Sequence, residues 1–141
     1  MNWKAEAVEK LRRFPLMRQA TQSIPKELER LEQEARSLQA GNAKLGAMNV
    51  RSQENMLLEN MIRRRELEEL CASAESWVAV TAGAIGQLTA QEEKLLTRLY
   101  VEEADVEQVC GELQLERSSL YRHREAALKK LTLALYGALE S

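Results

Sequence analysis

Cysteine and histidine are almost absent from this sequence of 141 residues, in which only Cys71, Cys110 and His123 occur. Two cysteines so far apart provide neither a zinc cluster nor the disulfide framework of a secreted domain. Each is expected to be a small buried side chain, as free cysteine usually is. A single imidazole excludes sites that need two histidines and leaves no apparent catalytic triad. We therefore expect no metal site.

Long hydrophobic runs and glycine-rich phosphate loops are also missing. No apolar stretch reaches the ~18 residues that a membrane-spanning helix needs, and residues 1–20 mix charged with hydrophobic side chains. The composition, with 45% hydrophobic and 30% charged residues, is typical of a folded domain. These features predict a cytoplasmic protein that does not contact the membrane. They give no argument for an enzyme, and no cofactor is expected.

Helical periodicity is abundant, and no stretch reads as a convincing strand, so an all-α fold is expected. Residues 3–14 place apolar side chains at steps of three and four, the spacing of one helical face. Pro15 is expected to end or kink that helix because it cannot donate a backbone hydrogen bond and restricts Phe14. A second break is expected at Ile24-Pro25, where Pro25 suits the first position of a new helix.

A helical hairpin is expected to follow. Residues 25–39 form a short coiled-coil-like seam, and residues 53–82 resume a long helical pattern. Between them, residues 41–52 contain two glycines and lose the periodicity, which predicts a mobile loop. The two helices are expected to pack antiparallel and to bury both apolar stripes.

The domain boundary is expected within residues 83–89, where Gly83 and Gly86 weaken the helix. Residues 1–86 would then be a helical hairpin or coiled region, and residues 87–141 a compact module.

The compact module reads as three helices. Thr89 with Glu92 forms a capping box, which begins a helix that buries leucines. A second box at Asp105 begins a short helix that ends near Gln114-Leu115, and a third helix begins at about Arg117 and extends toward Tyr136. A short second helix, a turn of a few residues and a third helix describe a helix-turn-helix.

In that motif the third helix lies in the DNA major groove and its first two turns meet bases and phosphates. The expected recognition helix is 117–131. Arginine can bond guanine edges in two places, while serine and tyrosine reach phosphates or bases. The expected DNA-binding residues are Arg117, Ser118, Ser119, Tyr121, Arg122, Arg124 and Lys129. The expected core positions are Leu115, Leu120, His123, Ala127 and Leu131. For Tyr121, covering the edge of the core is an equal alternative.

The charge pattern favours a local DNA-binding face over general basicity. Residues 90–141 hold seven Lys and Arg against ten Asp and Glu, whereas residues 1–89 hold thirteen against twelve. A protein that binds DNA by charge alone would be more basic. The acids precede the expected recognition helix and the bases lie on it, which predicts a DNA-facing side and an acidic side.

The stretch LTAQEEKLLTRLYVEEADVEQVCGELQLERSSLYRHREAALKKL, residues 88–131, resembles the promoter-reading C-terminal domain of bacterial sigma factors. With the LRRFP, IPKELERLEQE and RRRELEEL segments, the whole chain is similar to small phage-encoded or prophage-encoded transcriptional regulators of the RinA and ArpU type. This resemblance implies an accessory regulator of late genes in the bacterial host cell. It also implies double-stranded DNA as a partner and contact between the acidic face and RNA polymerase.

Two positions depart from the sigma pattern. Gln114 stands at a turn position that is often glycine, which is tolerable where the backbone is not strongly left-handed. Glu116 stands where Ser or Thr often caps the helix. Both leave the preferred DNA sequence open.

Alternatives remain for the function and for other charged segments. A small terminase subunit also joins a helix-turn-helix to coiled helices, and an interaction protein would use the hairpin without binding DNA. Arg63, Arg64 and Arg65 are interpreted as a solvated helix face rather than a second DNA patch. The sequence does not show where the basic N-terminal segment lies relative to the expected recognition helix. Surplus apolar residues in the tail 132–141 can dock on the protein's own N-terminal hairpin or on another subunit, and a homo-oligomer, preferably a dimer, is expected.

Overall fold

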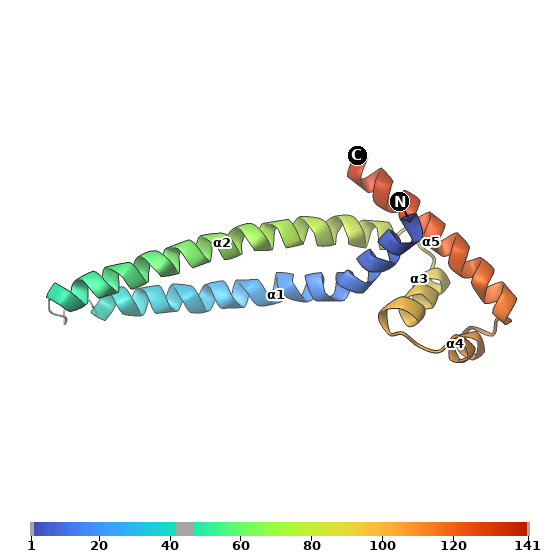
Figure 1. Ribbon diagram of the computed structural model, residues 1–141, viewed down its shortest axis with the longest axis horizontal. Helices are drawn as coiled ribbons and strands as arrows, with labels where there is room; N and C mark the ends of the chain where they lie inside the picture. Colours follow the sequence, from blue (N-terminus) through green and yellow to red (C-terminus); the bar gives the residue numbers. More distant parts are fainter. Residues whose placement is uncertain (1, 42–46, 141) are drawn as a thin grey trace. The chain divides into compact units, whose positions relative to one another are not determined.

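The computed structural model describes residues 2–41 and 47–140, and within these ranges it contains helices and no strand. The elements are α1 (Trp3–Gly41), α2 (Ala47–Ile85), α3 (Ala90–Leu96), a π-helical turn η2 (Thr97–Val101), α4 (Val106–Leu113) and α5 (Arg117–Glu140) (Figure 1). The predicted all-α fold is confirmed. None of the described helices, including the long α1 and α2, has an apolar stretch sufficient to span a membrane.

Two compact units divide the chain. One contains residues 18–41 and 47–75, and the other combines residues 2–17 with residues 76–140. The predicted boundary after residue 86 differs from this division, because residues 2–17 and 76–86 belong to the same unit as residues 87–140. Each unit is described separately below.

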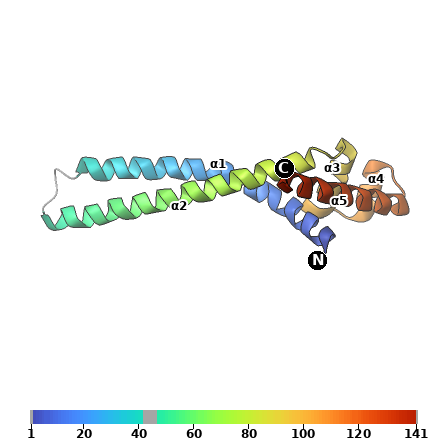
Figure 2. The same ribbon diagram turned by 90° about the horizontal axis from the view of Figure 1, so that it is seen from above.

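The first unit is the antiparallel hairpin that the sequence predicts, formed by α1 and α2 (Figure 2). Near its loop end, Gly41 lies against the side chain of Gln53, and farther along Asn60 Nδ2 donates to the carbonyl of Leu31 at 2.9 Å. The buried apolar residues are small or few: Leu31, Ala35, Cys71 and Ala74. Gln53 and Asn60 are buried with them, so part of the interface between the helices is polar.

The prolines do not end a helix, because α1 continues through both Pro15 and Pro25, so the expected helix start at Pro25 is wrong and of the two outcomes expected at Pro15 the helix end is excluded. A proline removes one backbone hydrogen bond from a helix and crowds the preceding turn. The side chains of both prolines are exposed, so neither ring has to fit into the core. Leu11 before Pro15 and Leu31 after Pro25 are buried, and their packing helps to hold the helix together across these positions.

The predicted loop 41–52 is also largely wrong. Gly41 ends α1, residues 47–52 already belong to α2, and residues 42–46 lie outside the described part of the chain. Residues 47–52 contain neither glycine nor proline, so nothing in them opposes helix formation. The loss of apolar periodicity was therefore a poor indicator of a loop here.

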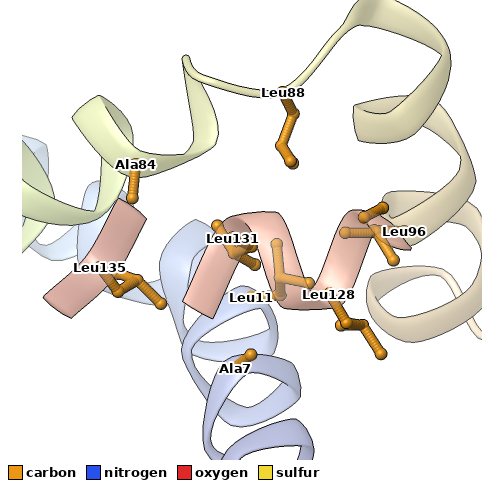
Figure 3. Packing of buried hydrophobic residues seen from close by; sticks show 9 residues of the cluster. Ala7, Leu11, Ala84, Leu88, Leu96, Leu128, Leu131 and Leu135 are labelled. Carbon is orange, nitrogen blue, oxygen red and sulfur yellow. The ribbon is translucent and has the colours of Figure 1, made fainter. Parts of the chain in front are cut away.

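The second unit is organised around α5 (Figure 3). Side chains from α1, α2 and α3 surround α5 in its main core, which consists of Ala7, Leu11, Ala84, Leu88, Leu96, Ala127, Leu128, Leu131 and Leu135. A second, smaller core beneath α4 joins Leu95, Val109 and Leu120, with Cys110 packed partly buried against it. Leu135, from the tail, therefore lies in one core with Ala7 and Leu11 of α1. The sequence allowed the tail to pack either within its own chain or on another subunit, and Leu135 packs within the chain.

Candidate nucleic-acid interface

The segment from α3 to α5 begins with the predicted capping box. The backbone N–H of Glu92 donates to Thr89 Oγ1 at 3.1 Å, and the N–H of Thr89 donates to Glu92 Oε1 at 2.8 Å. This reciprocal pair satisfies two amides that the first turn of a helix leaves free. The backbone N–H of Thr89, together with Lys130 Nζ at 3.1 Å, lowers the pKa of Glu92 by stabilising its carboxylate. The box thus fixes the start of α3 and links Glu92 to α5.

After α3 the helix widens into the π-helical turn η2, in which the N–H of Glu102 donates to the carbonyl of Thr97. The chain then bends at Glu103, whose positive φ of 53° lies in the left-handed region. α4 starts at Val106 as predicted, but the second capping box is absent, because the exposed side chain of Asp105 accepts no capping hydrogen bond. Val109 is the fully buried residue of α4.

The turn after α4 is left-handed at Gln114, with φ 56° and ψ 45°. The condition under which glutamine replaces glycine there without cost, a backbone that is not strongly left-handed, is therefore not met. An L residue with a Cβ is disfavoured there relative to glycine. The bond from the N–H of Leu115 to the carbonyl of Cys110, at 3.0 Å, closes the end of α4 and stabilises the turn.

α5 starts at Arg117, with the carbonyl of Glu116 accepting the first helical hydrogen bond from Leu120, and it extends past the predicted Tyr136 to Glu140. Leu120, Ala127 and Leu131 are buried as predicted, and Leu115 packs partly buried beneath α4. His123 is exposed, which corrects its predicted core position. Because Leu128 and Leu135 are buried, the side of α5 that faces the core does not include His123.

The predicted DNA-binding residues fall into two groups on α5. Four of them are exposed: Arg117, Ser118, Arg122 and Lys129. The other three are partly buried: Ser119, Tyr121 and Arg124. Ser118, Arg122 and Lys129 follow one another at steps of four and seven, so they share one side of the helix. This side is opposite the buried residues and forms the exposed α5 face, defined here by these three residues.

Arg117 is already engaged by a carboxylate from the neighbouring helix. Its guanidinium lies 3.0 Å from Glu107 Oε1 of α4. Both side chains are exposed, at 60% and 68%, so solvent weakens the attraction between them. The predicted separation of acids from bases is therefore incomplete, because one carboxylate lies beside the first residue of the expected recognition helix.

Arg124 makes its contacts within the protein. Its guanidinium lies over the ring of Tyr121, 4.8 Å from the ring centre, and 3.4 Å from Glu125 Oε1. Its Nε is buried and has no hydrogen-bond partner among the described residues. Glu125 is also 2.6 Å from Lys4 Nζ, and the hydrogen bond with Lys4 lowers the pKa of Glu125. Arg124 and Tyr121 thus cover the edge of the core, whereas Arg122 is exposed.

Sequence reasoning missed the ion pairs that hold α4 in place. Arg98 of η2 donates to Glu112 of α4 through two nitrogens, at 2.9 and 2.7 Å, and also to Glu102. These bonds raise the pKa of Arg98 and lower that of Glu112. The sequence signal that could have revealed these pairs is the position of Arg98, a lone arginine within the acidic stretch before α5. Several acids of the expected acidic side therefore make intramolecular pairs, while Glu93, Glu103 and Asp105 stay exposed.

The basic N-terminal segment is partly committed to contacts within the same unit. Lys4 pairs with Glu125, and Arg12 Nε donates to the carbonyl of Tyr100 at 3.1 Å. On the hairpin, Arg63 and Arg65 are exposed, while Arg64 Nε donates to Asn60 Oδ1 at 2.8 Å. Arg64 therefore supports a buried amide.

Comparisons with protein-family models, curated proteins and solved structures found no match to this chain.

Proposed function

We propose that this protein is a sequence-specific, DNA-binding transcriptional regulator that reads the major groove with the exposed α5 face. The observation that carries the proposal is the succession of α4, a left-handed turn and α5, with Ser118, Arg122 and Lys129 exposed on the side of α5 away from its core. This is the arrangement in which helix-turn-helix proteins present a recognition helix.

Each exposed residue has a distinct role in this proposal. Arg122 bonds the O6 and N7 atoms of guanine, because its guanidinium presents paired donors. Ser118, in the first turn, donates to a phosphate, where the free amides and positive end of the helix dipole also favour an anion. Lys129 contacts a phosphate farther along the groove and so fixes the position of the helix.

Arg117 has a conditional role. It is paired with Glu107 in the free protein, and a phosphate of the approaching DNA replaces that exposed carboxylate.

The remaining exposed acids Glu93, Glu103 and Asp105 are the proposed contact for bacterial RNA polymerase, which a regulator of this kind recruits by charge complementarity.

A selection of bound duplexes from a random pool, repeated at two salt concentrations, tests the proposal. A specific regulator enriches one sequence motif at both salt concentrations, because base contacts depend less on released counterions than phosphate contacts do. Binding without a motif that collapses at the higher salt would instead favour a packaging role like that of a small terminase subunit. No binding at either salt would overturn DNA recognition altogether.

A further inference from the structure

The hairpin presents large apolar side chains to solvent on α2. Leu58, Met61 and Ile62 are exposed at 51%, 53% and 48%. The contact with α1 uses a different side of α2, marked by the buried residues Gln53, Asn60, Cys71 and Ala74. Three large apolar side chains within five residues on a helix face in water indicate a surface that another molecule covers.

This side of α2 has the spacing of a second coiled-coil seam. Exposed residues recur at alternating steps of four and three, and we name them the outer seam: Arg51, Asn55, Leu58, Ile62, Arg65, Glu69 and Ala72. The buried side of α2 shows the same alternation, so α2 carries two seams and only one is occupied by α1. The hairpin's own core is small, and the outer seam offers Leu58 and Ile62 as further apolar surface for burial.

Two copies of the outer seam have complementary charges when they run in opposite directions. When two copies of α2 run antiparallel so that paired residue numbers add to 120, Leu58 faces Ile62 and Arg51 faces Glu69. Both pairs occur twice because of the two-fold symmetry. Arg65 then faces the neutral Asn55. A parallel arrangement would instead place Arg51 against Arg51 and Glu69 against Glu69, which repel.

We propose that a second copy of this chain occupies the outer seam, with the two α2 helices antiparallel about Leu58 and Ile62. The four helices of the two hairpins then lie in the order α1, α2, α2, α1, and the exposed apolar side chains of each α2 are buried against the other copy. The dimer carries two helix-turn-helix units, as regulators that read paired half-sites do. The proposal does not rest on DNA binding, since it is tested with the protein alone.

Sedimentation equilibrium of the full chain measures the dimer directly. We expect twice the chain mass of 16.0 kDa for the wild type. The double variant L58K/I62K is expected to be monomeric at about 100 μM, a concentration that populates dimers with micromolar dissociation constants. The matched control M56K/L70K places two lysines at exposed apolar positions of α2 outside the outer seam, and it should remain dimeric. Circular dichroism of each variant checks that its helix content is unchanged.

A charge exchange tests the orientation. R51E replaces two attractive pairs of the dimer by two repulsive ones and is expected to raise the dissociation constant about tenfold. R51E/E69R restores both ion pairs with the positive and negative residues exchanged. It should return the dissociation constant of the dimer to within about threefold of the wild-type value. Failure of this rescue, or a dimer that M56K/L70K rather than L58K/I62K disrupts, overturns the proposed face. A monomeric wild type also overturns it and would leave the outer seam to a different protein.

Discussion

Single residues of α4 and of the turn before α5 combine local strain with exposed charge. Gln114 holds a left-handed conformation that glycine adopts without steric cost, and it does so at the turn that sets the direction of α5. Glu107 sets its carboxylate 3.0 Å from Arg117. Neither feature belongs to the hydrophobic core, so each can be changed without opening a cavity.

Replacing Gln114 by glycine is expected to stabilise the second unit. Removing the Cβ relieves the left-handed strain, and after the greater chain entropy of unfolded glycine is subtracted, the free energy of unfolding should rise by about 0.5–1 kcal/mol. Urea unfolding measures this change. Q108G is the matched control, because it places glycine inside α4 and should lower stability by about 1 kcal/mol. A Q114G protein no more stable than the wild type would contradict the strain argument.

Replacing Glu107 by glutamine is expected to strengthen DNA binding about twofold to fivefold, because it frees Arg117 and removes a negative charge from the DNA-facing side. Fluorescence anisotropy with a duplex from the selection measures the dissociation constant. E32Q makes the same charge change at an exposed position of the hairpin and should leave affinity unchanged. Weaker binding by E107Q would mean that the carboxylate itself contacts a base or orients Arg117 for one.

At the scale of elements, local motifs predicted helix starts better than helix interruptions. The Thr89 box fixes the start of α3 because both of its hydrogen bonds lie within one turn. Pro15 and Pro25 did not interrupt α1, since each removes only one bond and the packed side of the helix compensates. The Asp105 box failed because a suitable residue pair does not by itself orient the capping side chain.

The capping box predicts how acid affects stability. Its backbone hydrogen bond and Lys130 lower the pKa of Glu92 from the ordinary value of 4.5. A depressed folded-state pKa contributes stability that is present above pH 4.5 and is lost as the pH falls through the folded value. E92Q keeps an acceptor for the N–H of Thr89 but does not titrate, so its stability should fall less below pH 4.5 than that of the wild type. Urea unfolding across this pH range provides the test, and identical acid profiles for the two proteins would contradict it.

At the scale of the molecule, the sequence predicted the all-α class, the antiparallel hairpin and the order of the last three helices. It did not predict that residues 2–17 belong with residues 76–140, because periodicity reports which side of a helix is buried but not against which segment. Lys4 and Arg12 show this limit, since their partners Glu125 and Tyr100 lie far along the chain.

In the candidate interface too, features set by helical spacing could be predicted from the sequence, and features set by packing between helices could not. Exposure of Arg122 follows from helical spacing alone. The stacking of Arg124 on Tyr121 and the pairing of Arg117 with Glu107 depend on how α4 and α5 pack, which spacing does not determine. His123 was misplaced because α5 presents Leu128 and Leu135 to the main core, a contact that involves α1, α2 and α3.

The central claim is that the exposed α5 face reads DNA, and the affinity of R122A for a duplex from the selection tests it most directly. We predict a loss of about 1–3 kcal/mol, roughly fivefold to 150-fold in the dissociation constant, with relaxed preference at one base position. R36A removes an exposed arginine from the hairpin and should bind within about twofold of the wild type. If R122A binds the duplex as tightly and as selectively as R36A, this face does not recognise DNA.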